Sequence, residues 1–209
     1  RSSDLAQKVY AGARDPAKIS LAGVTPIQLD VHSIADVQAA AQRAQDVTIV
    51  VNNAGIAQFG SFMAEDAEAA LRNHLETNVL GPLRVSRAFA PVLARNGGGA
   101  LLNVASIASW ITSPLLASYA VSKSALWSLS NGLRNDLRGQ GTQVLTLHMG
   151  FVDTDLTQGL EMPKETPEAI VERALQALEA GAQEVLADQV TQQVKAGLSA
   201  EQAVYLAAR

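Results

Sequence analysis

The stretch Val47-Thr48-Ile49-Val50-Val51-Asn52-Asn53-Ala54-Gly55 joins an apolar run directly to a short polar turn. Five consecutive residues that are mostly β-branched are typical of a buried parallel strand, which is covered on both faces. Asparagine and glycine tolerate positive φ, so the residues after the run suit a strand-to-loop turn. This stretch therefore predicts an interior strand of a parallel sheet.

Strand and helix patterns alternate on both sides of this stretch. Such alternation is the signature of a parallel sheet with helices on both faces, so we predict an α/β fold with a doubly wound parallel sheet. The predicted strands are 8–13, 25–31, 47–51, 100–106, 142–148 and 184–187. The predicted helical segments are 34–44, helical material within 65–95, 117–138, 166–181, and a terminal helix marked by Val190, Val194 and Leu198.

Composition limits the classes of protein that fit. A chain of 209 residues that is 48% hydrophobic can bury one substantial core, which favours a single domain over residues 1–209. A net charge of -4 without a basic run argues against nucleic acid as a partner. The absence of cysteine excludes disulfides and thiol catalysis. No apolar stretch reaches the ~18 residues of a membrane span, so we expect no membrane partner and a cytoplasmic protein.

Tyr119 and Lys123 lie four positions apart in the predicted 117–138 helix, which places them on its apolar stripe. Ser106 ends the apolar run before that helix. A lysine buried beside a phenol makes sense if its charge lowers the phenol's pKa, because one charge at about 4 Å contributes roughly 4 kcal/mol at an effective dielectric near 20. The alternative is a lysine that extends along the helix surface to water, which is the commoner outcome for this spacing alone.

The order of motifs decides between these readings. The chain carries Asn52-Asn53-Ala54-Gly55, then Asn78, then Ser106, then Tyr119-x-x-x-Lys123. This ordered set resembles the short-chain dehydrogenase/reductase family over about residues 8–188 and implies a Rossmann-like sheet. The resemblance implies an oxidoreductase that moves a hydride between a nicotinamide and a carbonyl carbon. It gives four residues a catalytic role: Tyr119 as proton donor, Ser106 as hydrogen-bond donor to the substrate oxygen, Lys123 as the group that tunes Tyr119 and holds the ribose, and Asn78 as the holder of a water.

The resemblance also implies cofactor contacts. Arg14 follows the 8–13 strand where relatives that prefer NAD usually have a carboxylate, so NADP(H) is favoured over NAD(H). Arg14 could instead form an ordinary surface pair with Asp15. Asp30 corresponds to the aspartate beside the adenine, or else is a turn residue. The remaining implied contacts, besides Tyr119 and Lys123, are Asn52, Ala54, Gly55, Val152 and Thr154.

Other residues have structural interpretations that involve no catalysis or ligand binding. Ser106 could be only a strand-end hydroxyl that starts a turn. His32, His74 and His148 share no ligand spacing, so we expect no metal site. Gly97-Gly98-Gly99 precedes a strand instead of a helix and is expected to be a loop without phosphate-binding capacity.

A dinucleotide-binding sheet begins with a strand, a glycine-rich turn and a helix, and residue 1 falls after that point in the motif order. We therefore expect this sequence to lack the first strand and the glycine-rich turn, about 25–30 residues in length. That strand would lie at the centre of the sheet, so strands 8–13 and 47–51 are expected to face each other across a groove one strand wide, roughly 10 Å, without pairing.

The substrate pocket is expected between 107–116, 59–63 and 156–163, because loops beyond the carboxyl ends of strands form it. Trp110, Ile111, Leu115 and Leu116 favour a small hydrophobic carbonyl or alcohol as substrate. The resemblance also implies a homodimer or homotetramer through helices 65–95 and 117–138. Two rival functions stay open: a non-catalytic nucleotide sensor and a module that only oligomerises.

Overall fold

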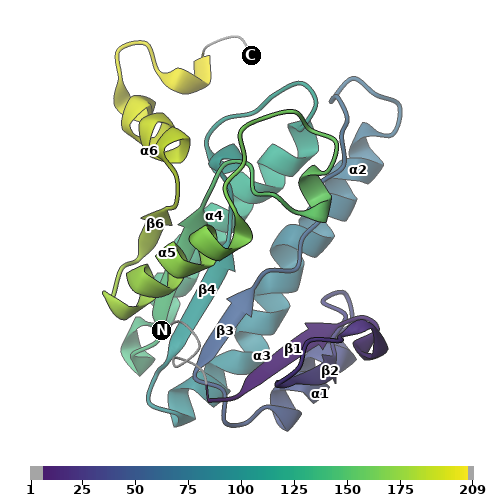
Figure 1. Cartoon of the computed structure of the whole chain (residues 1–209), viewed down its shortest axis with the longest axis vertical. Coiled ribbons are helices and arrows are strands. Elements are labelled where there is room, and N and C mark those ends of the chain that lie inside the picture. Colours follow the sequence, from purple (N-terminus) through teal and green to yellow (C-terminus); the bar gives the residue numbers. More distant parts are fainter. Residues whose placement is uncertain (1–6, 207–209) are drawn as a thin grey trace.

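The computed structural model describes residues 7–206 and contains two parallel β-sheets (Figure 1). In the smaller sheet, β1 (Val9–Ala13) pairs with β2 (Val24–Gln28). The larger sheet has the order β3-β4-β5-β6, formed by Ile49–Asn52, Ala100–Val104, Gln143–His148 and Glu184–Leu186. Every pairing is parallel, which confirms the predicted α/β class.

Helices connect the strands in the predicted order. The α-helices are α1 (Ile34–Arg43), α2 (Ala67–Leu75), α3 (Gly81–Arg95), α4 (Ala117–Asp136), α5 (Pro167–Glu179) and α6 (Gln189–Ala196). A π-helical turn, η3 (Glu76–Leu80), joins α2 to α3, and a 3-10 turn, η4 (Ile107–Ser109), follows β4. Short 3-10 turns also occur at Pro16–Lys18, Arg138–Gln140, Asp155–Thr157, Gly197–Ser199 and Val204–Leu206.

Two hydrophobic clusters cover opposite faces of the larger sheet. Successive strand residues point to opposite faces, so Leu101 joins one cluster and Leu102 the other. The first cluster is covered by α1, α3 and α4, and the second by α5. This arrangement is the doubly wound covering that the sequence predicts, and it fixes the carboxyl ends of the strands at one edge of the sheet.

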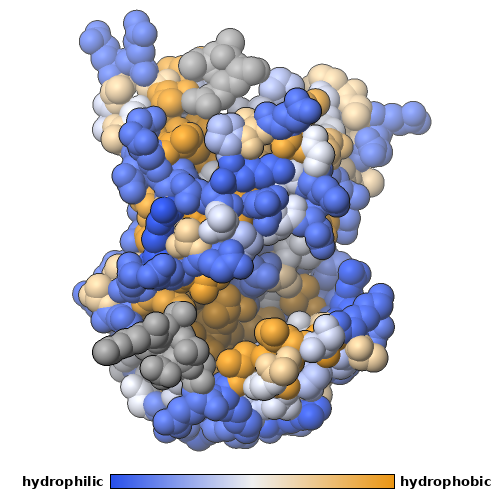
Figure 2. Space-filling view, in the orientation of Figure 1, coloured by the Kyte–Doolittle hydropathy of each residue, from blue (hydrophilic) through white to orange (hydrophobic). Residues whose placement is uncertain are grey.

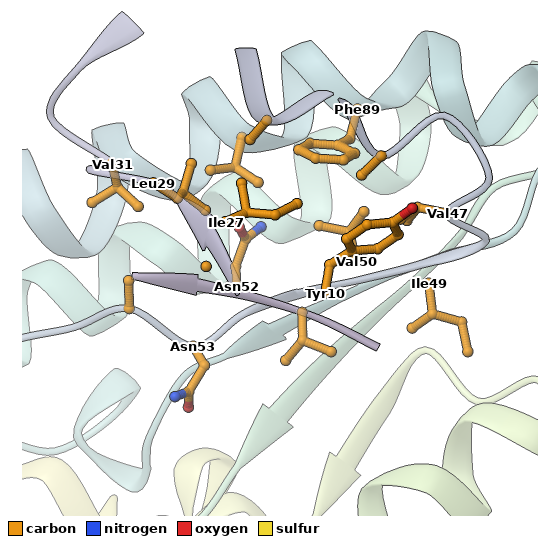
Figure 3. Close-up of a pocket in the computed structure, with 16 residues that line it drawn as sticks. Tyr10, Ile27, Leu29, Val31, Val47, Ile49, Val50, Asn52, Asn53 and Phe89 are labelled. Atoms are coloured by element: carbon orange, nitrogen blue, oxygen red, sulfur yellow. The ribbon is translucent and has the colours of Figure 1, made fainter. Parts of the chain in front are cut away.

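An open slot lies between β1 and β3, which do not pair with each other. A pocket of about 350 Å³ occupies it, lined from both sheets and from α1 and α3. Ile27, Val50 and Phe89 converge on this pocket in Figure 3, and Figure 2 shows hydrophobic surface in a hollow in the lower half of the molecule. The expectation that these two strand edges face each other unpaired is confirmed.

Polar contacts hold the two sheets together at one end of the slot. Asp46, just before β3, accepts hydrogen bonds from the Tyr10 hydroxyl at 2.7 Å and from Lys8 Nζ at 2.8 Å. On the face of β3 opposite to Val50, Ile49 and Val51 remain 43% and 53% exposed. The slot is thus bounded by two strand edges whose amino ends are tied together.

The predicted change from strand to loop after β3 is confirmed, although none of Asn52–Gly55 has positive φ. The predicted loop at Gly97-Gly98-Gly99 is also confirmed. All three residues have positive φ, and a Cβ on Gly99 would lie 2.2 Å from the Thr48 carbonyl oxygen, so that loop requires glycine.

Two local expectations are wrong. β2 ends at Gln28 instead of residue 31, because Asp30 begins a turn. Val190 is 59% exposed and does not join the apolar side of α6.

Within residues 7–206, no helix combines the length and the apolar character that crossing a bilayer requires.

Candidate active site

Tyr119 and Lys123 lie in the first two turns of α4. The buried residues of this helix include Lys123, Leu126, Ser130 and Leu133, so the predicted apolar stripe is confirmed. Lys123 is only 6% exposed and does not extend to water. Its Nζ donates a hydrogen bond to the Val104 carbonyl oxygen at 2.7 Å, which ties the lysine to the last residue of β4.

Burial changes the acid–base properties of Lys123. It lowers the pKa of the ammonium from 10.5 to about 8. The cation also lies 5.6 Å from the centroid of the Tyr119 ring. A lysine with this pKa can hold a charge at neutral pH and release a proton at moderate cost, which suits a group that relays protons.

The pKa of Tyr119 shifts in the direction opposite to the sequence expectation. Burial raises the pKa of its phenol, and a hydrogen bond with the Ser106 side chain acts in the lowering direction. Desolvation wins because Lys123 directs its ammonium at Val104 and not at the phenol oxygen. Tyr119 is therefore held as a protonated phenol in this arrangement, the form that a proton donor needs.

Ser106 combines the two roles that its sequence position allowed. Its Oγ accepts a hydrogen bond from the Ala108 amide at 3.1 Å and so caps the turn η4. The same side chain reaches Tyr119. The serine is 7% exposed, so one hydroxyl both ends the strand segment and faces the phenol.

Asn78 lies in the π-helical turn η3 and is fully enclosed at 1% exposure. Its Nδ2 donates to the Ile56 carbonyl and to Ser122 Oγ, both at 2.9 Å, and its Oδ1 accepts from the Ile56 amide at 2.9 Å. Both amide protons are thus in use, and Oδ1 keeps one lone pair for a further partner. π-Helical turns often occur at functional sites because they redirect a side chain.

Gly55 lies beside this group. A Cβ at Gly55 would be 3.4 Å from Asn78 Oδ1 and 3.9 Å from Lys123 Nζ. Ala54 and Gly55 are exposed, and their small size leaves the approach to Lys123 open. The structure therefore brings together Gly55, Asn78, Ser106, Tyr119 and Lys123.

The other predicted contacts lie elsewhere or turn inward. Asn52 Nδ2 donates to Asn103 Oδ1 at 2.8 Å and to Ser86 Oγ at 3.2 Å, so this side chain cross-links the sheet to α3. Val152 and Thr154 lie in the segment after β5, where the Val152 carbonyl accepts from the Thr154 hydroxyl at 3.4 Å. Their predicted contact with a nicotinamide stays a prediction.

Arg14 and Asp30 follow β1 and β2 across the slot. Asp30 Oδ1 accepts from the His32 amide at 2.9 Å, which matches the turn reading. Asp15 caps the Ala17 amide and lies 4.0 Å from Lys18, whereas Arg14 is exposed and makes no ion pair within residues 7–206. Arg14 and Asp15 thus form no ion pair among the described residues, and both readings of Arg14, as an exposed loop residue and as a contact to a 2′-phosphate, stay predictions.

The predicted pocket wall is present in part. The Gly60 amide donates to the Leu115 carbonyl at 2.9 Å and so joins the predicted segment 59–63 to the predicted segment 107–116. Trp110 does not line this wall, because its ring turns inward and stacks on His148. The exposed apolar side chains in the three predicted wall segments are Phe59, Phe62, Met63, Leu115, Leu156 and Met162.

Sequence reasoning missed three supporting residues. His74 contacts the Tyr119 ring, Ser122 accepts from Asn78, and His148 hydrogen-bonds the Ser106 carbonyl. Only Ser122, three residues after Tyr119 on the same helix, carried a local signal. Among the described residues, no group of three histidine, cysteine or acidic side chains has the geometry of a metal site.

Comparison with known proteins assigns the family. Residues 5–165 match the sequence model described as short chain dehydrogenase, so this chain belongs to the short-chain dehydrogenase family.

Individual relatives support this assignment. The chain is 35% identical over 162 residues to the short chain dehydrogenase pigC of Monascus ruber, covering 75% of this chain and 53% of that protein. It is 37% identical over 121 residues to the 1-deoxy-11-beta-hydroxypentalenate dehydrogenase of Streptomyces exfoliatus, covering 57% of this chain and 44% of the relative. The chain thus spans about half, or less, of the length of these relatives.

Solved structures agree. A short chain dehydrogenase from Burkholderia cenocepacia J2315, in complex with NADP, superimposes with a TM-score of 0.88 at 36% identity, covering 94% of this chain and 83% of that one. A ketone-specific alcohol dehydrogenase from Comamonas testosteroni shares the fold with a TM-score of 0.73 at 21% identity, covering 96% of this chain and 87% of that chain.

Proposed function

We propose that this protein reduces a hydrophobic ketone or aldehyde with NADPH, or oxidises the corresponding alcohol. The observation that carries the proposal is the cluster of Ser106, Tyr119 and Lys123, in which a hydroxyl meets a protonated phenol beside a lysine whose pKa lies near 8. This combination supplies a proton donor, a second hydrogen bond to the same substrate oxygen and a charged group behind them.

The residues present suit a nicotinamide dinucleotide. Gly55 leaves space beside Lys123 Nζ, where a ribose hydroxyl can approach, and a Cβ there would reduce it. Arg14 presents an exposed guanidinium after β1 that has no ion-pair partner in the part of the chain that the structure describes, which suits a 2′-phosphate. The 36% identical structural neighbour that binds NADP supports the same cofactor here. When bound, the nicotinamide supplies or accepts the hydride.

The protein's own part is proton delivery and orientation. Tyr119 Oη gives its proton to the carbonyl oxygen as that oxygen gains negative charge, and Ser106 Oγ hydrogen-bonds the same oxygen. The positive charge of Lys123, 5.6 Å from the centroid of the Tyr119 ring, stabilises the resulting phenolate, which takes up a proton from solvent. Asn78 holds the 55–56 backbone in place, and the free lone pair of its Oδ1 suits the water that links Lys123 to solvent.

The proposed substrate is apolar because the exposed side chains around the pocket are apolar. Phe59 is 58% exposed, Met63 89% and Leu115 65%. The hydrogen bond from Gly60 to Leu115 holds two of the wall segments together, so these side chains form a joint surface. An alkyl or aryl group beside the carbonyl would bury this surface on binding, at about 25 cal/mol per Å².

The test measures NADPH oxidation by the intact protein with a series of methyl ketones and aldehydes of increasing chain length. We expect saturable turnover, and kcat/KM that rises with chain length because more apolar surface is buried. Saturable NADPH binding without turnover on any member would favour the nucleotide-sensor alternative. Assembly without NADPH binding, seen by sedimentation, would favour the oligomerisation module.

A further inference from the structure

The backbone of Ser106 is held from behind by the end of β5. His148, the last residue of β5, is fully buried, and its Nδ1 lies 3.1 Å from the Ser106 carbonyl oxygen. A carbonyl can only accept, so Nδ1 carries the proton and the tautomer is fixed. The next residue along each segment repeats the contact, since the Ile107 amide donates to the Met149 carbonyl at 2.8 Å.

The far side of the His148 ring is held by an aromatic and an acidic residue. The Trp110 ring stacks on the imidazole with centroids 4.2 Å apart and planes at 23°. Among the described residues, Trp110 Nε1 is buried without a hydrogen-bond partner, so contacts of the ring itself place this side chain. His148 Nε2 lies 3.3 Å from Glu184 Oε1 in β6. Nε2 makes no hydrogen bond among the described residues, so the carboxylate borders this edge of the ring without accepting a proton from it.

Glu184 is fixed in turn by α4 and α6. Trp127 Nε1 donates to its Oε1 at 3.1 Å, and Lys195 Nζ lies 3.0 Å from its Oε2. The contact with His148, reinforced by Lys195, lowers the pKa of Glu184 to about 2, so it is a carboxylate at neutral pH. Arg134 of α4 is the other cation near this carboxylate, and it donates to the Gln183 carbonyl at 2.9 Å.

Lys195 of α6 also contacts Trp110 and Trp127. Its ammonium lies 4.5 Å from the centroid of the Trp110 ring and 5.0 Å from that of Trp127. A cation over an indole face is attracted by the negative face of the ring, and more strongly when it is partly desolvated. The helix α6 therefore reaches Ser106 through a chain of contacts: Lys195, Glu184, His148.

We propose that His148 is a positioning residue for Ser106, and that Glu184 and Lys195 hold it in place so that α6 forms part of the catalytic apparatus. The expected effect of His148 on turnover rests on the proposed function. His148 acts through the Ser106 backbone: a shift of that carbonyl displaces the hydroxyl that faces Tyr119. A misplacement of a few tenths of an ångström weakens the hydrogen bond to the substrate oxygen most in the transition state.

The first test compares two variants that remove the imidazole equally. In His148→Asn, the amide nitrogen occupies the place of Nδ1 and can donate to Ser106. His148→Leu removes this donor and leaves the Ser109 amide, 3.0 Å away, as the remaining donor to the Ser106 carbonyl. We expect the leucine variant to lose about tenfold or more in kcat with an unchanged Kd for NADPH, and the asparagine variant to recover most of that loss. Equal kcat in both variants would overturn the proposal.

Lys195→Met provides a second variant that leaves the Ser106 hydrogen bond untouched, in case His148→Leu does not fold. We expect a several-fold lower kcat, because Glu184 and Trp110 then hold His148 less firmly. Ile170→Val, in the apolar cluster under α5, is the control for loss of core packing and should leave kcat unchanged. A Lys195→Met protein with the kcat of the original would contradict the role of α6.

A third readout does not depend on turnover. The Nδ1 proton of His148 should give an NMR resonance that exchanges slowly with water, and Lys195→Met should speed that exchange. A rapidly exchanging or absent resonance in the original protein would overturn the inference even if the enzyme is active. If the resonance behaves as expected but no carbonyl is reduced, the proposed function fails and the structural link from α6 to Ser106 stands.

Discussion

The imidazole of His74 meets the ring of Tyr119 edge to face, with centroids 6.2 Å apart and planes at 70°. His74 comes from α2 and is fully buried. Its Nδ1 lies 2.8 Å from the Ala70 carbonyl oxygen, to which it donates, and its Nε2 accepts from the Gln58 amide at 3.0 Å. Nε2 can accept only when the ring is neutral, so a neutral histidine supports the proposed proton donor and the loop that precedes α2.

Acid should weaken the fold through His74. Burial lowers its pKa, so the unfolded chain takes up the proton first and stability falls as pH drops below about 6.5. We expect the free energy of unfolding, measured with urea, to fall less between about pH 7.5 and 5.5 in His74→Gln than in the original protein. The two losses should differ by at most about 1.4 kcal/mol per pH unit. His32→Gln, which changes an exposed histidine, is the control. An equal loss in His74→Gln and the original would contradict the neutral, buried state of His74.

Lys123 should change the stability of the fold at alkaline pH. Its pKa of about 8 in the folded protein is below the ordinary 10.5, so the unfolded chain holds the proton between these values and stability rises with pH there. From about pH 8 to 9.5 the gain attributable to Lys123 should be on the order of 2 kcal/mol, and Lys123→Met should remove it. Equal pH dependence in both proteins, measured by denaturant unfolding, would show that Lys123 is not desolvated.

Arg14 should discriminate between the two nicotinamide cofactors. A charge-assisted hydrogen bond to a 2′-phosphate contributes about 1.5–3 kcal/mol, so Arg14→Ala should raise KM for NADPH by roughly 10- to 100-fold and leave KM for NADH nearly unchanged. Lys18→Ala removes a neighbouring exposed cation and is the matched control. Equal effects of Arg14→Ala on both cofactors would show that Arg14 does not contact the phosphate.

The elements that the sequence predicted correctly are those that depend on residues close together in the chain. Runs of apolar residues predicted β3 and β4, and the spacing of Lys123 and Leu126 predicted the buried side of α4. Strand ends were less accurate because turn chemistry at residues such as Asp30 shortened them.

The parts that sequence missed depend on distant contacts. His74 and Tyr119 are 45 positions apart, and His148 and Ser106 are 42 positions apart. No pattern within one helix or strand links such pairs. The direction of the Tyr119 pKa was wrong for the same reason, since it depends on where Lys123 directs its ammonium and on how deeply the phenol is buried.

The central claim is that Tyr119 delivers the proton during carbonyl reduction, and the most direct test is steady-state turnover of Tyr119→Phe with NADPH and an apolar ketone. Only the hydroxyl is removed, so we expect kcat to fall by about a hundredfold or more while the Kd for NADPH stays nearly unchanged. Tyr205→Phe, at a side chain that is 54% exposed, should leave kcat unchanged. If Tyr119→Phe kept more than about a tenth of the original kcat, the assignment of Tyr119 as proton donor would be wrong.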